Sequence, residues 1–334
     1  MRAIVIAGAL NLELRDIERC PLKLNELRIK VAVSAVCGSD LKMIKRPFRP
    51  GFQIPGHEFA GKVIESYDGS SSLMGERVTA FPMFSCLQCD SCKRREYRDC
   101  MHKPSLGFDL QGTYAEEVII DERFAIRLHD KITYEQGALI EHLSCGFRLA
   151  IEVEKLVQAS GRILILGDGP MALADLQFLK LLGYDDITLV GKHQQRMDFA
   201  MGIGAKQVLP FEMFVKAYQN SKKLFDAFIF TVSSPAAIDS LSHCFKNEVV
   251  VFPQARINDE YMARLAAERK ARFGRAFAYH IDDFPKVMNL IVSGKIKSSE
   301  LISARVNLTE VEKLVSFIYD KNKLKTLIVN PAFC

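Results

Sequence analysis

The stretch Ile163-Leu164-Ile165-Leu166-Gly167-Asp168-Gly169-Pro170-Met171-Ala172 decides the fold. Its apolar start suits a buried strand, and Met171 to Lys180 continues with helical spacing. Glycine at 167 permits a tight turn, and glycine at 169 lets a pyrophosphate approach the unpaired N–H groups at the helix amino terminus. An ordinary strand-to-helix turn is the alternative. We predict a dinucleotide-binding loop that uses Gly167, Gly169, Pro170, Met171 and Ala172, with Ala172 at the third glycine position.

The pattern of expected strands and helices changes twice along the chain, and the changes predict an α/β protein of two domains. Residues 1–140 contain short β-branched runs and turns, which indicate a mainly β domain. Residues 141–282 alternate strands and helices, as in a doubly wound parallel sheet. Residues 283–334 hold two helices and a strand, and we expect them to complete the first domain. The strands expected in 141–282 are 162–166, 187–190, 207–209, 227–230, 248–252 and 276–279, the last being the candidate edge strand.

The composition is that of a globular protein and excludes several classes. The chain has 334 residues, 49% of them apolar and 25% charged. Its net charge of +5 is spread along the sequence, so we expect no nucleic-acid partner. No segment reaches the roughly 18 uncharged apolar residues that a membrane span needs. Nine cysteines without a secretory signal favour a reducing compartment, and we expect a cytoplasmic protein.

Four of the cysteines lie within fifteen residues, at Cys86, Cys89, Cys92 and Cys100. Tetrahedral zinc takes four thiolates, and a short looped segment is able to wrap them around one ion. A site with four protein ligands has no open position for substrate, so this zinc would be structural. The alternative is a set of free or disulfide-bonded cysteines.

A second group of metal ligands lies in the first domain and at its end. Cys37, His57, Glu58 and Glu141 offer a thiolate, an imidazole and two carboxylates, the mixed set that leaves zinc an open position. Such a zinc ion polarises a carbonyl and stabilises an alkoxide. Each residue has an alternative interpretation when it is considered alone: Cys37 as a small buried apolar residue, His57 as a turn residue and Glu58 as a surface charge.

Motifs along almost the whole chain resemble those of the zinc-containing medium-chain dehydrogenase/reductase family, and the polyol dehydrogenase branch in particular. Beside the residues above, they are Cys37-Gly-Ser-Asp40, Gly56-His-Glu58, Gly75-Glu-Arg-Val78, Gln111-Gly-Thr-Tyr-Ala-Glu116 and Leu139-Ile-Glu141. The resemblance implies a GroES-like catalytic domain, a Rossmann domain and an active site in the cleft between them. It also implies a homodimer or homotetramer.

The same resemblance implies roles for the residues of the site. Cys37 and His57 would bind the catalytic zinc, and Glu58 and Glu141 would coordinate it directly or through water. Ser39 would pass the proton of a substrate hydroxyl toward solvent. The implied reaction is hydride transfer between a nicotinamide cofactor and a secondary alcohol or ketone. Lys42 stands where many relatives have histidine, and His142 replaces a proline that often follows the glutamate.

The residues after the second expected strand of the Rossmann domain indicate which nicotinamide cofactor binds. An NAD-preferring fold has an acidic residue there, about 20 positions after the glycine loop. In this chain the position is Gly191, followed by Lys192, His193 and Arg196, which suit a 2′-phosphate. We therefore predict NADP(H) over NAD(H); the alternative is a solvated helix start with incidental cations. Asp168, inside the loop, either points away from the pyrophosphate or weakens its binding.

A basic loop suggests the substrate class. The loop after the first zinc ligand contains Lys42, Lys45, Arg46 and Arg49. In the family that the chain resembles, this region borders the substrate cleft. Four cations at this place would bind a phosphate or carboxylate, which favours a phosphorylated polyol, and a solvated basic loop is the alternative. The competing functions are a zinc-free quinone or enoyl reductase and a non-catalytic nucleotide or redox sensor on the same fold.

Overall fold

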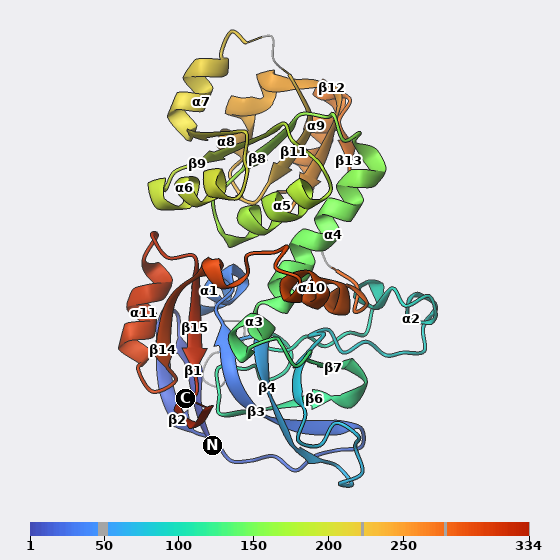
Figure 1. Cartoon of the computed structure of the whole chain (residues 1–334), viewed down its shortest axis with the longest axis vertical. Helices are drawn as coiled ribbons and strands as arrows, with labels where there is room; N and C mark the ends of the chain where they lie inside the picture. Colours follow the sequence, from blue (N-terminus) through green and yellow to red (C-terminus); the bar gives the residue numbers. More distant parts are fainter. Residues whose placement is uncertain (46–52, 222–223, 277–278, 334) are drawn as a thin grey trace. The chain divides into compact units, whose positions relative to one another are not determined.

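The computed structural model describes residues 1–45, 53–221, 224–276 and 279–333. Arg46 and Arg49 of the basic loop lie outside these residues. The chain divides into two compact units, one of residues 1–142 and 280–334 and the other of residues 143–279. The amino-terminal and carboxy-terminal segments therefore build one unit together (Figure 1).

The first unit is built on a seven-stranded sheet with the order β14-β15-β3-β4-β5-β7, in which β6 pairs with β3 as well. Only β14 and β15 are parallel, and the remaining pairs are antiparallel. A separate ribbon is formed by β1 (Arg2–Gly8) and β2 (Asn11–Asp16). The sheet strands are β3 (Glu26–Ala35), β4 (Glu58–Ser66), β5 (Arg77–Ala80), β6 (Glu117–Asp121), β7 (Ala125–Arg127), β14 (Ile302–Asn307) and β15 (Lys325–Val329).

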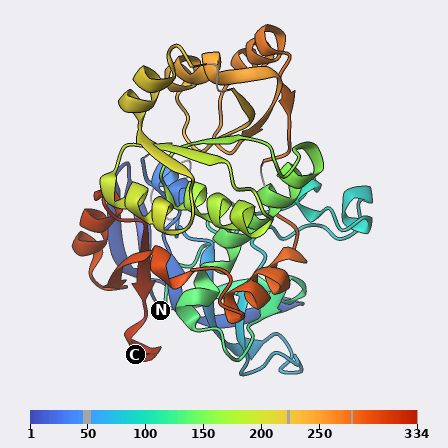
Figure 2. The ribbon, with the colours of Figure 1, turned by 45° about the horizontal axis from the view of Figure 1, so that its top comes forward.

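Helices cover parts of this unit and connect its strands. They are α1 (Gly38–Lys45), α2 (Asp90–Lys93), α3 (Tyr134–Ala138), α10 (Asp283–Val292) and α11 (Val311–Tyr319), and α4 (Ile140–Leu156) begins at the end of the unit. One core cluster joins the β1–β2 ribbon to α1, α11 and β15 through buried residues that include Ile4, Ile44, Leu314 and Ile328. Short α2 lies on a segment that extends away from the sheet (cyan in Figures 1 and 2).

The second unit is a fully parallel six-stranded sheet with the order β10-β9-β8-β11-β12-β13. The first strand of this unit, β8, lies in the middle of the sheet, and the strand order reverses beside it, which is the doubly wound topology. The expected fold class, a Rossmann domain beside a mainly β GroES-like domain, is confirmed. The strands are β8 (Ile163–Leu166), β9 (Ile187–Gly191), β10 (Gln207–Pro210), β11 (Phe225–Phe230), β12 (Phe245–Pro253) and β13 (Arg272–Phe273).

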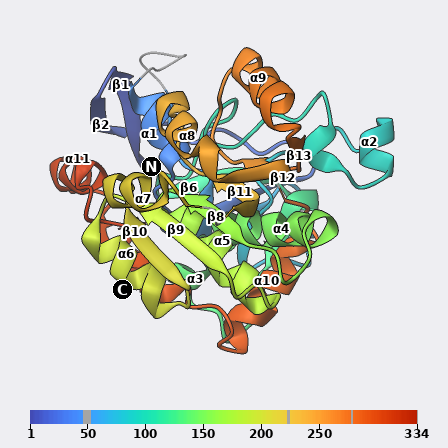
Figure 3. The same ribbon diagram turned by 90° about the horizontal axis from the view of Figure 1, so that it is seen from above.

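Both faces of this parallel sheet carry helices, which is why its central strands are apolar throughout. On one face Phe214 and Tyr218 of α7, Ile238 of α8 and Leu265 of α9 pack against the sheet. Helices α5 and α6 lie on the opposite side in Figure 3. The helices are α5 (Pro170–Leu181), α6 (Gln194–Gly202), α7 (Phe211–Tyr218), α8 (Pro235–Leu241) and α9 (Asp259–Arg269).

The last strand of the second unit differs from the expectation. The apolar run 276–279 predicted the edge strand, but the pairing with β12 is made by Arg272 and Phe273. Residues 277 and 278 lie outside the described part, and Ala276 and Tyr279 are not in a strand. The edge strand therefore consists of two exposed residues, which no apolar pattern would reveal.

No helix among the described residues is both long and apolar enough to cross a membrane.

Candidate functional site

Strand pairing brings three of the predicted metal ligands together. In the antiparallel pair of β3 and β4, Ala35 lies opposite Glu58. Cys37 follows the end of β3, and His57 precedes β4, so the register places both next to Glu58. The ligand atoms of Cys37, His57 and Glu58 all lie within 4.8 Å of one another. His57 and Glu58 are buried, whereas Cys37 is partly exposed.

Asp40, on α1, organises two of these three residues. Its Oδ2 accepts hydrogen bonds from the backbone N–H of Cys37 at 3.0 Å and from the Tyr114 hydroxyl at 2.8 Å. Its Oδ1 lies 3.2 Å from Nδ1 of His57. Burial raises the pKa of Asp40, but His57, Cys37 and Tyr114 outweigh burial and hold that pKa below its usual value. A carboxylate on one imidazole nitrogen orients the ring and leaves the other nitrogen available to a metal.

Glu58 has a buried cationic partner, Lys325, from the far end of the chain. Nζ of Lys325 donates to both carboxylate oxygens of Glu58, at 2.6 and 2.5 Å, and to the carbonyl of Val36 at 3.3 Å. The two side chains are 2% and 0% exposed. Burial lowers the pKa of Lys325, but the nearby Glu58, Cys37 and Glu141 raise it above its usual value. Lys325 therefore offsets negative charge at this group of ligands.

The other residues predicted for this site are placed less tightly. Glu141 is buried in the first turn of α4, but it is outside the set whose ligand atoms lie within 4.8 Å. Ser39, on α1, has a buried Oγ with no hydrogen-bond partner among the described residues. Lys42 and Lys45 are exposed on α1, and Nζ of Lys45 lies 5.7 Å from the centre of the Tyr319 ring.

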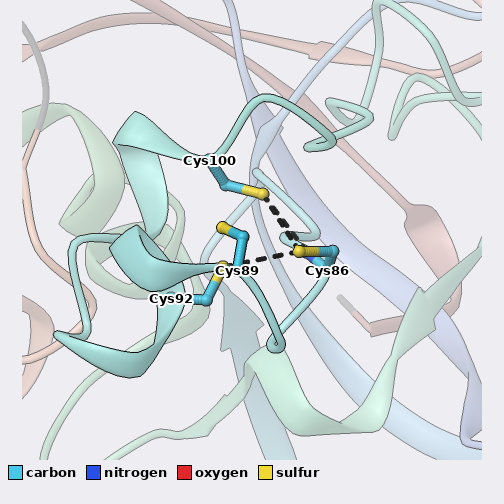
Figure 4. A group of neighbouring side chains, drawn as sticks. All are labelled: Cys86, Cys89, Cys92 and Cys100. Atoms are coloured by element: carbon cyan, nitrogen blue, oxygen red, sulfur yellow. Dashed lines mark hydrogen bonds between the residues drawn. The ribbon is translucent and has the colours of Figure 1, made fainter.

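The four clustered cysteines converge around one point (Figure 4). Sγ of Cys86 lies 3.5 Å from Sγ of Cys100 and 3.9 Å from Sγ of Cys92. Four sulfurs at about 2.3 Å from a tetrahedral zinc ion stand about 3.8 Å apart. Backbone N–H groups of Gln88 and Cys89 lower the pKa of the Cys86 thiol to about 6. Spacing and donor type therefore fit a closed zinc site.

The glycine loop of the second unit has the backbone that the sequence suggests. Gly167 has φ of +124°, and a Cβ there would stand 2.1 Å from Oγ1 of Thr231, so only glycine fits. Gly169 is the N-cap of α5, and a Cβ there would meet no atom within 4 Å. Pro170 and Met171 begin the helix, and Ala172 is buried in its first turn. The space beside Gly169 is therefore open, and an anion is able to approach the helix amino terminus there.

The predicted cofactor cations gather at the end of β9, and the loop carboxylate lies among them. Asp168 directs its carboxylate to the turn that contains Lys192 and His193. Nδ1 of His193 lies 3.0 Å from Oδ2 of Asp168, and Nη1 of Arg196 lies 3.8 Å from Oδ1. The structure thus adds an acid to the group that Gly191, Lys192, His193 and Arg196 form.

Two residues of these sites were missing from the sequence-based set for different reasons. Asp40 belongs to the quoted Cys37–Asp40 motif, so its position was visible although its contacts were not. Lys325 precedes the apolar run Thr326–Val329 and reads as a solvated strand end. Only the pairing of β15 with β3 brings it to Glu58, which is 267 residues away in the chain.

Sequence comparison finds relatives of this chain among the polyol dehydrogenases. Residues 23–130 match the alcohol dehydrogenase GroES-like domain. The D-arabitol-phosphate dehydrogenase of Enterococcus avium is 27% identical, with 91% of this chain and 90% of the relative covered. The sorbitol dehydrogenase of Bacillus subtilis is 24% identical over 99% of this chain and 97% of its own length.

Solved structures share the fold over nearly the whole chain. A short chain alcohol dehydrogenase of Escherichia coli complexed with NADH superposes with a TM-score of 0.87 at 20% identity, covering 98% of this chain and 99% of its own. A zinc-binding dehydrogenase of Sinorhizobium meliloti bound to NADP gives 0.82 at 21% identity, covering 98% of both chains. The likenesses confirm the resemblance seen in the motifs: this chain is similar to the zinc-containing medium-chain dehydrogenase/reductases, and to the polyol dehydrogenases among them.

Proposed function

We propose that the protein is a zinc-dependent oxidoreductase that transfers a hydride between a nicotinamide cofactor and a secondary alcohol or ketone. The observation that carries the proposal is the group of Cys37, His57 and Glu58, which offers a thiolate, an imidazole and a carboxylate within 4.8 Å. These are ligands that zinc takes in sites with an open position. The relatedness to alcohol and polyol dehydrogenases supports the same reaction class.

In this proposal each residue of the first unit has a stated task. Cys37 and the free nitrogen of His57 hold the metal, while Asp40 holds the other nitrogen of His57. Glu58 is engaged on both oxygens by Lys325, so it remains beside the metal without a full free charge. Glu141 would reach the metal directly or through water. The bound zinc ion would polarise the substrate oxygen.

Ser39 is proposed to receive the proton of the substrate hydroxyl. Its Oγ is buried and lacks a hydrogen-bond partner among the residues that the structure describes. A buried hydroxyl without a partner is costly, and a substrate hydroxyl would remove this cost.

A second, structural zinc ion would be held by the four cysteines Cys86, Cys89, Cys92 and Cys100.

The second unit would hold the cofactor at the amino terminus of α5. Gly167, Gly169, Pro170, Met171 and Ala172 would surround the pyrophosphate. Lys192, His193 and Arg196 support the preference for NADP(H) that the sequence predicts. Asp168 opposes it, because a carboxylate already lies against two of these cations.

The substrate class we propose is a polyol or phosphorylated polyol. The relatives include a D-arabitol-phosphate dehydrogenase and a sorbitol dehydrogenase. Lys42 and Lys45 are exposed on α1, the helix that also carries Ser39 and Asp40, so a substrate phosphate would find cations nearby. We further propose a homodimer or homotetramer in the cytoplasm, as expected from the resemblance and the cysteine usage.

Metal content per chain tests the proposal. We expect two zinc ions in the wild type, and one in each of Cys37→Ser and Cys92→Ser, by elemental analysis of purified protein. Cys244→Ser is the matched control, because Cys244 is a buried cysteine of the second unit outside both ligand groups. Only the wild type and this control should oxidise a panel of polyols and polyol phosphates with NAD or NADP.

Three results would overturn parts of the proposal. One zinc ion in the wild type that Cys37→Ser retains would leave the zinc-free quinone or enoyl reductase as the better reading. Two zinc ions and cofactor binding without turnover across the panel would favour the nucleotide or redox sensor. Equal turnover of sugar phosphates and neutral polyols would remove the phosphate from the substrate proposal.

A further inference from the structure

The carboxylate of Asp168 fills an anion-binding place made by the turn after β9. Its Oδ2 accepts hydrogen bonds from the backbone N–H groups of Lys192 at 2.6 Å and of His193 at 2.7 Å. Nδ1 of His193 lies 3.0 Å from the same oxygen, and Nη1 of Arg196 lies 3.8 Å from Oδ1. The side chain of Asp168 is only 8% exposed. Two amides and two side chains thus converge on one buried carboxylate.

The carboxylate of Asp168 lies where dinucleotide-binding folds bind the ribose of the cofactor. In such folds an acidic residue at the end of the second strand binds the ribose 2′-hydroxyl. The second strand here is β9, and its last residue is Gly191. A Cβ built on Gly191 would stand 2.7 Å from Oδ2 of Asp168. The carboxylate of Asp168 therefore occupies the space of the missing side chain at 191, reached from the glycine loop instead of from the strand.

We propose that Asp168 is the specificity-determining residue of the cofactor site, and that it selects NAD(H) by excluding the 2′-phosphate of NADP(H). This inference rests on the proposed function, because it assumes a nicotinamide dinucleotide on the glycine loop. A 2′-phosphate brings about two negative charges to a place that already holds one. It would also compete with Asp168 for the two backbone amides. A 2′-hydroxyl carries no charge and is able to donate a hydrogen bond to the carboxylate.

The cations that predicted NADP(H) have other partners in the structure. His193 and Arg196 face Asp168, as described above. Nζ of Lys192 lies 5.9 Å from the centre of the Phe211 ring, on α7. Burial raises the pKa of Asp168, but the amides of Lys192 and His193 and the His193 ring lower it below the usual value, so the group is charged at neutral pH. Asp168 therefore offsets part of the positive charge of this cluster before any phosphate arrives, and we propose NAD(H) in place of the NADP(H) that the sequence predicts.

The test is the ratio of the dissociation constants of NADPH and NADH, measured by calorimetric titration of the zinc-loaded wild type and of Asp168→Asn and Asp168→Ser. We expect the wild type to bind NADH about tenfold or more tightly than NADPH, since like charges brought together are costly. Both variants should shift the ratio toward NADPH by about tenfold or more. Asp226→Asn is the matched control, because Asp226 also accepts a backbone N–H, from Arg162, at a different place in the sheet. Its ratio should equal that of the wild type.

The outcomes separate this inference from the proposed function. Tighter binding of NADPH by the wild type would overturn the inference, and this result does not depend on whether a variant folds. An unchanged ratio in both variants, with unfolding midpoints near that of the wild type, would overturn it as well. In either case binding of one dinucleotide would leave the proposed function standing. Failure of the wild type to bind either dinucleotide would overturn both.

Discussion

Replacing Lys325 by methionine should destabilise the first unit more than any surface lysine replacement. The methionine keeps most of the length of the side chain and removes its charge. Glu58 would then be a carboxylate, 0% exposed, without the cation that now donates to both of its oxygens at 2.6 and 2.5 Å. Cys37, another ligand group of the same cluster, would lose the same offset, because it too acts on Lys325.

The size of the effect follows from the geometry. Two unit charges about 4 Å apart interact by about 4 kcal/mol at an effective dielectric constant of 20. Removing one partner of a buried ion pair costs about 3–5 kcal/mol, since the remaining charge stays desolvated. We therefore expect Lys325→Met to lower the free energy of unfolding by about 3–5 kcal/mol. Lys325→Met combined with Glu58→Gln should lose clearly less than the sum of the two single variants.

Urea denaturation followed by far-ultraviolet circular dichroism measures these differences on zinc-loaded protein. Lys206→Met is the control, because Lys206 pairs with Asp186 at 2.8 Å while its side chain is 60% exposed. An exposed pair contributes at most about 1 kcal/mol. A loss for Lys325→Met as small as that of Lys206→Met would refute the reasoning. Strict additivity of Lys325→Met and Glu58→Gln would refute it too, since the cycle would then show no coupling.

Three further substitutions test the second unit. Gly167→Ala should cost about 1–3 kcal/mol of stability, because φ is +124° and the new Cβ would meet Thr231. Gly169→Ala should keep the unfolding midpoint and weaken NADH binding. Thermal unfolding measures the stability of the two variants, and calorimetry measures their NADH binding. Burial holds the pKa of Asp175 well above its ordinary value, so the wild type loses stability as pH rises above about 4, where the unfolded chain ionises. Asp175→Asn should therefore raise the unfolding midpoint at pH 7 and leave it unchanged near pH 3, and an equal shift at both values would contradict this account.

The fold of the second unit was predictable because its strands are buried on both faces. Ile163–Leu166 and Phe225–Phe230 are almost wholly buried, so they read as continuous apolar runs. The two-residue β13 has no such signal, since both of its residues are exposed. In the first unit β14 was missed as well, because only Ala304 and Val306 of its residues are buried. A strand becomes visible in the sequence to the extent that packing selects its residues.

The candidate site was predictable where its residues are neighbours in the chain. Cys37 and the pair His57–Glu58 stand in short motifs, and a single strand register brings the motifs together. The contacts of Lys325 and Asp168 could not be predicted from the sequence, because each side chain contacts residues that are distant in the chain. Asp168 was recognised as a charge in the loop, but its direction depends on the absence of a side chain at Gly191. The partners of the charged side chains in a site thus depend on the fold, and the amino-acid sequence alone predicts them poorly.

The cysteine segment 86–100 differs from the rest of the first unit in what holds it together. Helix α2 has four residues, too few for a helix that is stable alone. In the segment, Cys86 and Cys89 are partly exposed and Cys92 and Cys100 are buried, and a metal ion would join all four. Folding of such a segment is coupled to the binding of its metal. We therefore expect zinc removal to unfold this segment before the sheet.

Limited trypsin digestion during titration with a zinc chelator tests this expectation. The segment carries three consecutive basic residues whose side chains are 60–70% exposed, Lys93, Arg94 and Arg95, so cleavage there reports its unfolding. Cleavage at 93–95 should begin as the first zinc ion leaves, while circular dichroism of the sheet is unchanged. Cys92→Ser should be cleaved there without chelator. Cys37→Ser should resist as the wild type does, because Cys37 belongs to the other ligand group, near Asp40 of α1 and Lys325 of β15. Equal resistance of Cys92→Ser and the wild type would show that contacts other than the metal hold the segment.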